Sequence, residues 1–114
     1  MSPAAPVPPG VPPMPERTPA ALREAIARYA PHLLADFEAH GRRASGDTSD
    51  LAAVPAFMAR WWGEYAIARD PHLDTHVTDL EARATEATDA AEARKLLEEA
   101  STIRHMAART EPGR

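Results

Sequence analysis

The sequence predicts an all-α protein, a small bundle of about five helices. Alanine supplies 25 of the 114 residues and is the best helix former. Apolar residues recur at helical spacing, as at Leu22, Ala25, Ile26 and Tyr29. β-branched residues are sparse, and no stretch shows the alternation of a half-buried strand. The expected helices cover approximately residues 18–29, 32–45, 50–69, 71–85 and 89–109.

Residues 1–16 are expected to form a disordered, proline-rich leader. The leader carries seven prolines, each of which removes a backbone donor and fixes φ. It is either a solvated tail or a docking peptide for an aromatic groove. We expect a single helical domain over 17–109, followed by a frayed tail over 110–114.

Capping residues and prolines predict the limits of the first two helices. Thr18 followed by Pro19 is typical of an N-cap and a first helical position. Pro31 ends this helix, because the residue before a proline avoids the α region, and it can begin the next one. The second helix is expected to run into a polar loop at residues 45–49.

The last two helices are predicted by the same kind of signal. Asp70 followed by Pro71 repeats the combination of cap and proline. No large apolar residue occurs over residues 81–95, and Asp89 begins a pattern that resembles a capping box. We therefore expect a break near residues 85–88.

Residues 50–70 hold both tryptophans of the chain. On a helical wheel Phe57, Trp61 and Tyr65 share one face, and Trp62 falls on its edge. Since tryptophan is enriched at interface hot spots, all four are predicted partner-binding residues. The alternative is that Trp62 lies over a neighbouring helix and completes a small core.

The net charge of −4 limits the function classes. Residues 70–109 carry nine acidic and five basic side chains, so the acidity lies in the C-terminal half. This balance argues against nucleic-acid binding and suits a basic protein partner. The core is thin in large apolar residues, so a protein partner or a homo-oligomer could supply the missing burial. The sequence shows no membrane-length apolar run and no signal peptide, which predicts a cytoplasmic protein.

Two sets of histidines occur at helical spacing. His32 and His40 flank Asp36, and His72 precedes His76 by four residues. Two imidazoles on one helical face could bind a divalent metal if a second helix contributed. The alternative is that they are exposed histidines in charged helices. No cysteine is present to assist.

No motif of an enzyme is present in the sequence. GxSxG, P-loop and GxGxxG patterns do not occur. Glu64, beside the aromatic face, is the acid to test first for a perturbed pKa. We therefore predict no catalytic residue, no cofactor and no metal, and expect a non-enzymatic protein.

Three stretches, TPAALREAI, PHLLADFEAH and DLAAVPAFMARWWGEYA, carry a family resemblance. Over approximately residues 12–71 the chain resembles a family of unknown function, short helical proteins of high-GC bacteria. Members share a proline-rich leader and an Asp-Leu-initiated helix with tryptophan. Gly41 stands where that family is expected to carry a bulkier residue, often tryptophan. Members can be encoded beside RelE/ParE-like toxins, so the resemblance implies an antitoxin-like role.

The main functional hypothesis is a protein-interaction module, an antitoxin-like partner of a small basic toxin. One alternative is a helix-turn-helix-like DNA-binding regulator, because Arg42 and Arg43 precede a loop and a helix. A second alternative is a small metal-binding protein that uses the histidines and aspartates described above.

Overall fold

The computed structural model describes residues 10–114, which contain α-helices, one short 3₁₀ helix and no strand. The all-α prediction is confirmed, as is the number of about five helices. Residues 1–9 of the expected disordered leader lie outside the described residues. The helices are α1 (Pro19–Tyr29), η1 (Pro31–Leu33), α2 (Leu34–Gly46), α3 (Ala53–Ala68), α4 (Pro71–Glu86) and α5 (Ala90–Ala108).

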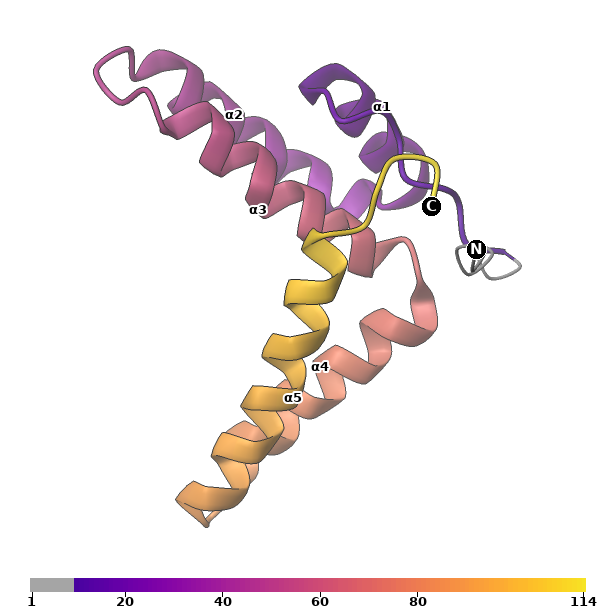
Figure 1. Cartoon of the computed structure of the whole chain (residues 1–114), viewed down its shortest axis with the longest axis vertical. Coiled ribbons are helices and arrows are strands. Elements are labelled where there is room, and N and C mark those ends of the chain that lie inside the picture. The colour runs from indigo at the N-terminus through magenta and orange to yellow at the C-terminus, as the bar shows by residue number, and fades with distance from the viewer. Residues whose placement is uncertain (1–9) are drawn as a thin grey trace, which may run out of the picture.

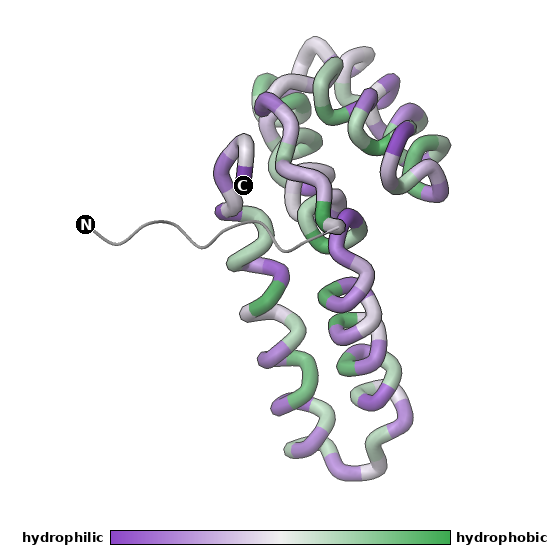
Figure 2. Tube along the Cα trace, turned by 90° about the vertical axis from the view of Figure 1, so that its right-hand side faces the viewer, coloured by the Kyte–Doolittle hydropathy of each residue, from purple (hydrophilic) through white to green (hydrophobic). Residues whose placement is uncertain are grey.

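The helices form a body and an arm. The body consists of α1, α2 and α3, with α2 and α3 side by side (Figure 1). The arm is the α4–α5 hairpin, which extends away from the body and returns so that α5 packs against α3 (Figures 1 and 2). The radius of gyration is 15.7 Å, against about 13 Å for a compact domain of about 100 residues. The arm accounts for the extended shape.

Side-chain caps fix the starts of three helices as the sequence predicts. Thr18, Asp70 and Asp89 each accept hydrogen bonds from backbone amides of the following first turn, at 3.0–3.2 Å. These bonds satisfy amides that have no partner within the helix. The break between α4 and α5 also falls near the expected place, since α4 ends at Glu86.

The start of α3 differs from the prediction, because α3 begins at Ala53 rather than near residue 50. The Asp50 carboxylate accepts from the Ala52 amide at 2.9 Å and holds a turn before the helix. No side chain caps α3 itself. Pro55 lies in the first turn of the helix, where its missing N–H costs no intrahelical bond.

Replacing Asp70 with alanine is expected to lower the free energy of unfolding by about 1 kcal/mol. The Asp70 carboxylate accepts from two backbone amides at the start of α4, and alanine can accept from neither. Urea denaturation followed by circular dichroism measures the change. The control is Asp79→Ala, because Asp79 makes only an exposed ion pair of 3.7 Å. Equal losses in the two variants would contradict a capping role.

The main core surrounds the C-terminal half of α3. α1 and α2 cover one side of α3, and α5 covers another, so α3 is buried around most of its circumference. Ile67 near the end of α3 is therefore buried, whereas Val54 in its first turn is 43% exposed. The main core also contains Leu22 and Ile26 of α1, Phe37 of α2 and Val77 of α4.

The arm has a second, smaller core along its length. It consists of Leu80 and Ala84 of α4 with Leu96 and Ala100 of α5. Ile103 is partly buried and packs against both cores. Because two of these four buried side chains are alanines, the outer part of the arm buries little apolar surface.

The described part of the leader packs against the body, which corrects the expectation of disorder for residues 10–16. Met14 is 3% exposed and belongs to the main core. Arg69 donates from Nη1 to the Pro12 carbonyl at 2.9 Å. The prolines prevent helix formation, but they do not prevent one apolar side chain from anchoring an extended segment.

The C-terminal segment, residues 110–114, also contacts the body rather than fraying. The Thr110 carbonyl accepts from Trp62 Nε1 at 2.8 Å. The Gly113 amide donates to the Met14 carbonyl at 2.8 Å, so the C-terminal segment and the leader hold each other. Gly113 has φ of +82°, a conformation that glycine adopts without steric cost.

Candidate functional site

The four predicted partner-binding residues lie in the core. Phe57, Trp61, Trp62 and Tyr65 are each at most 4% exposed. Phe57 and Trp61 pack against Phe37, with ring centroids 5.0 and 5.7 Å away. These side chains are not accessible at the surface of the folded chain, so the prediction that they bind a partner gains no support from this geometry. Trp62 is fully buried and completes the core, which was the alternative to a partner-binding role for this side chain.

The histidines are not brought together into a metal site. His40 Nδ1 accepts from Trp61 Nε1 at 2.9 Å, which places His40 against the aromatic core. His76 faces Glu99 at 3.5 Å across the arm. Within residues 10–114 no three histidine, cysteine or acidic side chains are arranged to hold a metal ion. The metal-binding alternative gains no support from this geometry.

The geometry also gives no support to the helix-turn-helix alternative. A recognition helix needs a free face that can enter the major groove. Here α3, the helix that follows Arg42 and Arg43, is the most buried element of the body. Its exposed first turn carries Val54, Pro55 and Ala56 rather than basic side chains.

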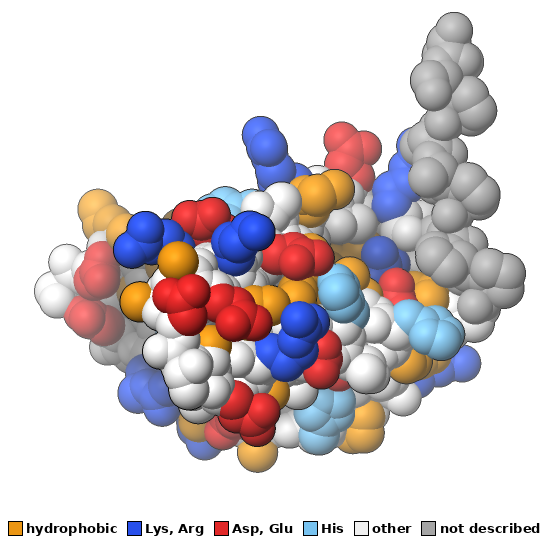
Figure 3. Space-filling model, turned by 90° about the horizontal axis from the view of Figure 1, so that it is seen from below, with side chains coloured by type: hydrophobic (Ala, Val, Ile, Leu, Met, Phe, Trp, Pro, Cys, Tyr) orange, Lys and Arg blue, Asp and Glu red, His pale blue; other side chains and the backbone are white. Residues whose placement is uncertain are grey.

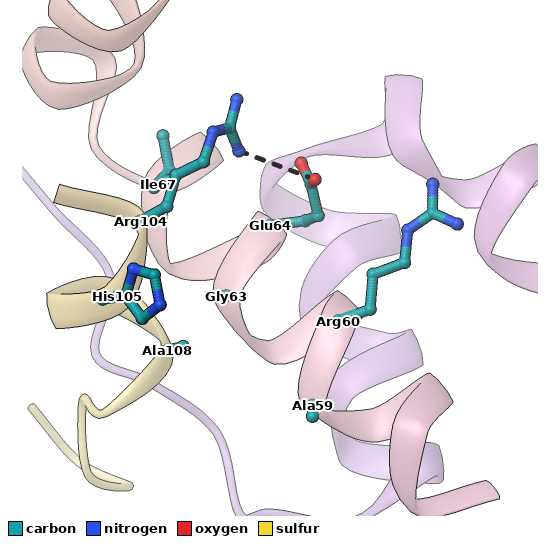
Figure 4. Close-up of a pocket in the computed structure, with 8 residues that line it drawn as sticks. All are labelled: Ala59, Arg60, Gly63, Glu64, Ile67, Arg104, His105 and Ala108. Carbon is teal, nitrogen blue, oxygen red and sulfur yellow. Dashed lines mark ion pairs between the residues drawn. The ribbon is translucent and has the colours of Figure 1, made fainter. Parts of the chain in front are cut away.

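A cleft of about 280 Å³ lies between α3 and α5 (Figure 4). Its floor contains Gly63 and Ala108, where the two helices approach closely. A Cβ atom built on Gly63 would lie 3.4 Å from the Ala108 Cβ. Charged and polar side chains stand around this floor, and Figure 4 shows Arg104 directed toward Glu64.

Arg104 links three helices beside this cleft. From α5 its Nη2 donates to Glu81 Oε1 of α4 at 2.8 Å, and its Nη1 lies 3.6 Å from Glu64 Oε1 of α3. Hydrogen bonding to Glu81 raises the pKa of the Arg104 guanidinium. Glu64 is thus a half-exposed ion-pair partner rather than a buried acid.

The other polar groups of the cleft also have partners. Arg60 lies over the Trp61 ring, 5.0 Å from its centroid. His105 Nδ1 lies 2.8 Å from the Ser101 carbonyl. The cleft therefore combines internally paired charges with a floor of small residues, and the Arg104–Glu64 ion pair joins α5 to α3 beside it.

The arm presents a free charged surface. Glu86, Glu92 and Glu98 are exposed and make no ion pair within residues 10–114. Two large apolar side chains of α5, Leu97 and Met106, are 50% and 69% exposed. Figure 3 views the molecule from the arm end and shows carboxylates grouped there among fewer cationic side chains. This surface is the candidate functional site.

Comparison with protein-family models, with curated proteins and with solved structures found no match to this chain. Within residues 10–114, no helix combines the length and the apolar character needed to cross a membrane.

Tyr65 is the one buried side chain of the described residues whose polar atom has no hydrogen-bond partner. Burial raises the pKa of the Tyr65 hydroxyl, and the nearby charge of Arg69 offsets part of that rise. Burial also lowers the pKa of Arg69. The Tyr65 hydroxyl is thus kept neutral and unpaired in the core.

Replacing Tyr65 with phenylalanine is expected to raise the free energy of unfolding by about 1 kcal/mol at neutral pH, because an unpaired buried hydroxyl is removed. In the parent chain the unfolded state ionises this phenol near pH 10, whereas the folded state keeps its proton. Stability is therefore expected to fall as pH rises above 10, and Tyr65→Phe removes this contribution.

Urea denaturation between pH 8 and 11 measures both effects. The control is Tyr29→Phe, since Tyr29 is 47% exposed. A Tyr65→Phe variant that is less stable than the parent at neutral pH would show that the hydroxyl has a partner.

Proposed function

We propose that this chain is a non-enzymatic protein-interaction module whose α4–α5 arm binds a small basic protein, an antitoxin-like role. The observation that carries the proposal is the exposed acidic surface of the arm, which stands apart from the body (Figures 1 and 3). The resemblance to proteins encoded beside RelE/ParE-like toxins agrees with a basic partner.

The charge of the arm supports this proposal. Residues 79–99 carry seven acidic and three basic side chains. Their net charge of −4 equals the net charge of the whole chain. The arm's own cations pair with part of this acidity, as Arg83 does with Asp79 at 3.7 Å. Glu86, Glu92 and Glu98 remain available to a partner. Such complementarity steers association and selects basic partners.

The packing of the arm also supports the proposal that it binds a protein partner. The outer arm is held by a small core, and Leu97 and Met106 of α5 remain exposed. A partner that covered Leu97, which adjoins Glu98 in the sequence, would bury apolar surface that the chain leaves in water. Binding would then stabilise the arm by mass action.

The test is co-expression with the product of the neighbouring gene, followed by titration of the purified complex. The triple variant Glu86→Gln/Glu92→Gln/Glu98→Gln is expected to bind roughly 10-fold or more weakly, since each lost charge pair contributes roughly 0.5–1 kcal/mol. Raising the salt concentration is expected to reduce this difference.

The matched control is Glu16→Gln/Glu24→Gln/Asp36→Asn, which makes the same charge change on the body and the leader. None of its three carboxylates forms an ion pair within residues 10–114. Equal weakening by both triple variants would indicate a net-charge effect and contradict an arm-specific site. Failure to form any complex would contradict the basic partner.

A further inference from the structure

A groove lies on the body between α1, α2 and the start of α3. We define it as the body groove; its volume is about 380 Å³, and no residue of the arm lines it. The nearly buried rings of Phe37 and Phe57 line its base, and Val54, which is 43% exposed, lines its rim. Figure 1 shows α1 beside the α2–α3 pair. The body groove therefore contains apolar surface that the chain itself leaves in water.

Charged side chains stand at the edge of the body groove. Arg23 of α1 donates from Nε to Glu38 Oε1 of α2 at 2.8 Å, so these two charges neutralise each other. Arg42 also lines the groove, one helical turn after Glu38, and forms no ion pair within residues 10–114. Two arginines and one glutamate give the lining a net charge of +1. The guanidinium of Arg42 carries this free charge.

The body groove suits an apolar molecule with a single negative charge. A guanidinium binds a carboxylate through two parallel hydrogen bonds. Ser45 also lines the groove, three residues after Arg42 and thus on the same side of α2, where its hydroxyl can donate a third hydrogen bond. A second negative charge on the ligand would lie near Glu38 without a free cation to pair with. The charge of the groove therefore matches one carboxylate.

The dimensions of the body groove favour a small molecule over a peptide. Along α2 its lining runs from Phe37 to Ser45, which is about 12 Å at the helical rise of about 1.5 Å per residue. At the Phe37 end the Arg23–Glu38 ion pair joins α1 to α2, so an extended chain would meet an ion pair rather than an open channel. A mainly apolar pocket with a few polar groups that fix orientation is the usual form of a small-ligand site.

We propose that the body groove binds a small apolar monocarboxylic acid. Its carboxylate pairs with Arg42, and its apolar part covers Val54 and contacts the exposed edge of Phe57. Charge pairing then fixes the orientation of the ligand, and apolar burial supplies affinity. The site lies on α1, α2 and α3, so this inference goes beyond the proposed function of the arm and does not depend on it.

The experiment titrates the full-length chain with phenylbutyrate and with phenylbutyramide, which has the same apolar part and no charge. Two-dimensional NMR of the backbone amides reports binding, and shifts are expected at groove residues such as Ala20, Gly41 and Val54. The Kd of phenylbutyrate is expected to be about 1 mM or lower, and that of phenylbutyramide about 10-fold higher, because the amide lacks the charge-assisted hydrogen bonds.

Three exposed positions provide the variants. Arg42→Gln removes the free charge and is expected to weaken phenylbutyrate binding about 10-fold without changing phenylbutyramide binding. The matched control is Arg43→Gln, because Arg43 is exposed, forms no ion pair within residues 10–114 and does not line the groove. Val54→Ser is expected to weaken both ligands by about 3-fold or more, since it removes apolar contact. Circular dichroism verifies that each variant is folded.

Each outcome decides the proposal. A loss of phenylbutyrate binding in Arg42→Gln that Arg43→Gln does not share supports it. Equal effects of these two variants, equal binding of acid and amide, or shifts that are absent from the groove residues overturn it. An acidic hexapeptide that contains leucine is the third probe. If the hexapeptide binds the groove more tightly than phenylbutyrate does, the groove is a peptide interface and the proposal is overturned.

Discussion

Replacing Trp62 with alanine is expected to lower the free energy of unfolding by about 3–5 kcal/mol. Trp62 is fully buried, its Nε1 donates to the Thr110 carbonyl at 2.8 Å, and Arg17 lies over its ring. The substitution opens a large cavity and leaves a carbonyl without its donor. Because small domains are stable by only about 5–15 kcal/mol, this loss removes a large share of the total.

Urea denaturation followed by circular dichroism measures the effect. Trp62→Phe keeps most of the ring volume and loses the hydrogen bond, so a smaller loss of about 1–2 kcal/mol is expected. The surface control is Met106→Ala, at a side chain that is 69% exposed. If Trp62→Ala unfolds at the same urea concentration as Met106→Ala, Trp62 does not hold the core.

Replacing Gly63 with leucine is expected to lower the free energy of unfolding by about 1–3 kcal/mol, because it overpacks the contact between α3 and α5. A Cβ atom at Gly63 would already lie 3.4 Å from the Ala108 Cβ. The leucine side chain extends beyond this contact and is expected to press on Ala108 and shift α5, and with it the arm. The same denaturation experiment measures the loss.

Two control variants isolate the close approach. Gly63→Ala adds a single methyl group at ordinary contact distance, so it is expected to be tolerated and to gain up to about 1 kcal/mol of helix propensity. Gly46→Leu makes the larger change where no atom lies within 4 Å of a built Cβ. Equal stability of Gly63→Leu and Gly46→Leu would contradict the need for a small residue at the α3–α5 contact.

Gly41 of α2 lies close to the aromatic core. In this chain a Cβ atom at Gly41 would lie 3.3 Å from the Phe57 ring. Phe57 therefore occupies the space beside Gly41, and a larger side chain there would require Phe57 to move.

The candidate site was only partly predictable. The acidity of the C-terminal half is a property of composition, and the sequence shows it directly. Which acids are free depends on how the helices pack. Arg104 pairs with Glu81, 23 residues away, and with Glu64, whereas Glu92 makes no ion pair within residues 10–114. No local pattern reveals such partners, because ion pairs between helices depend on how the helices pack.

The sequence by itself determined the all-α class, the approximate positions of the helices and the caps at Thr18, Asp70 and Asp89. These features depend on interactions within one helical turn, so neighbouring residues suffice to predict them. The tertiary structure alone decided that Trp62 is buried and that Met14 anchors the leader. Both depend on segments distant in the chain, since Trp62 meets Thr110 and the leader meets Arg69 and Gly113. Helical periodicity shows that a residue lies at the edge of an apolar face, but burial of that edge requires a neighbour that only the folded chain provides.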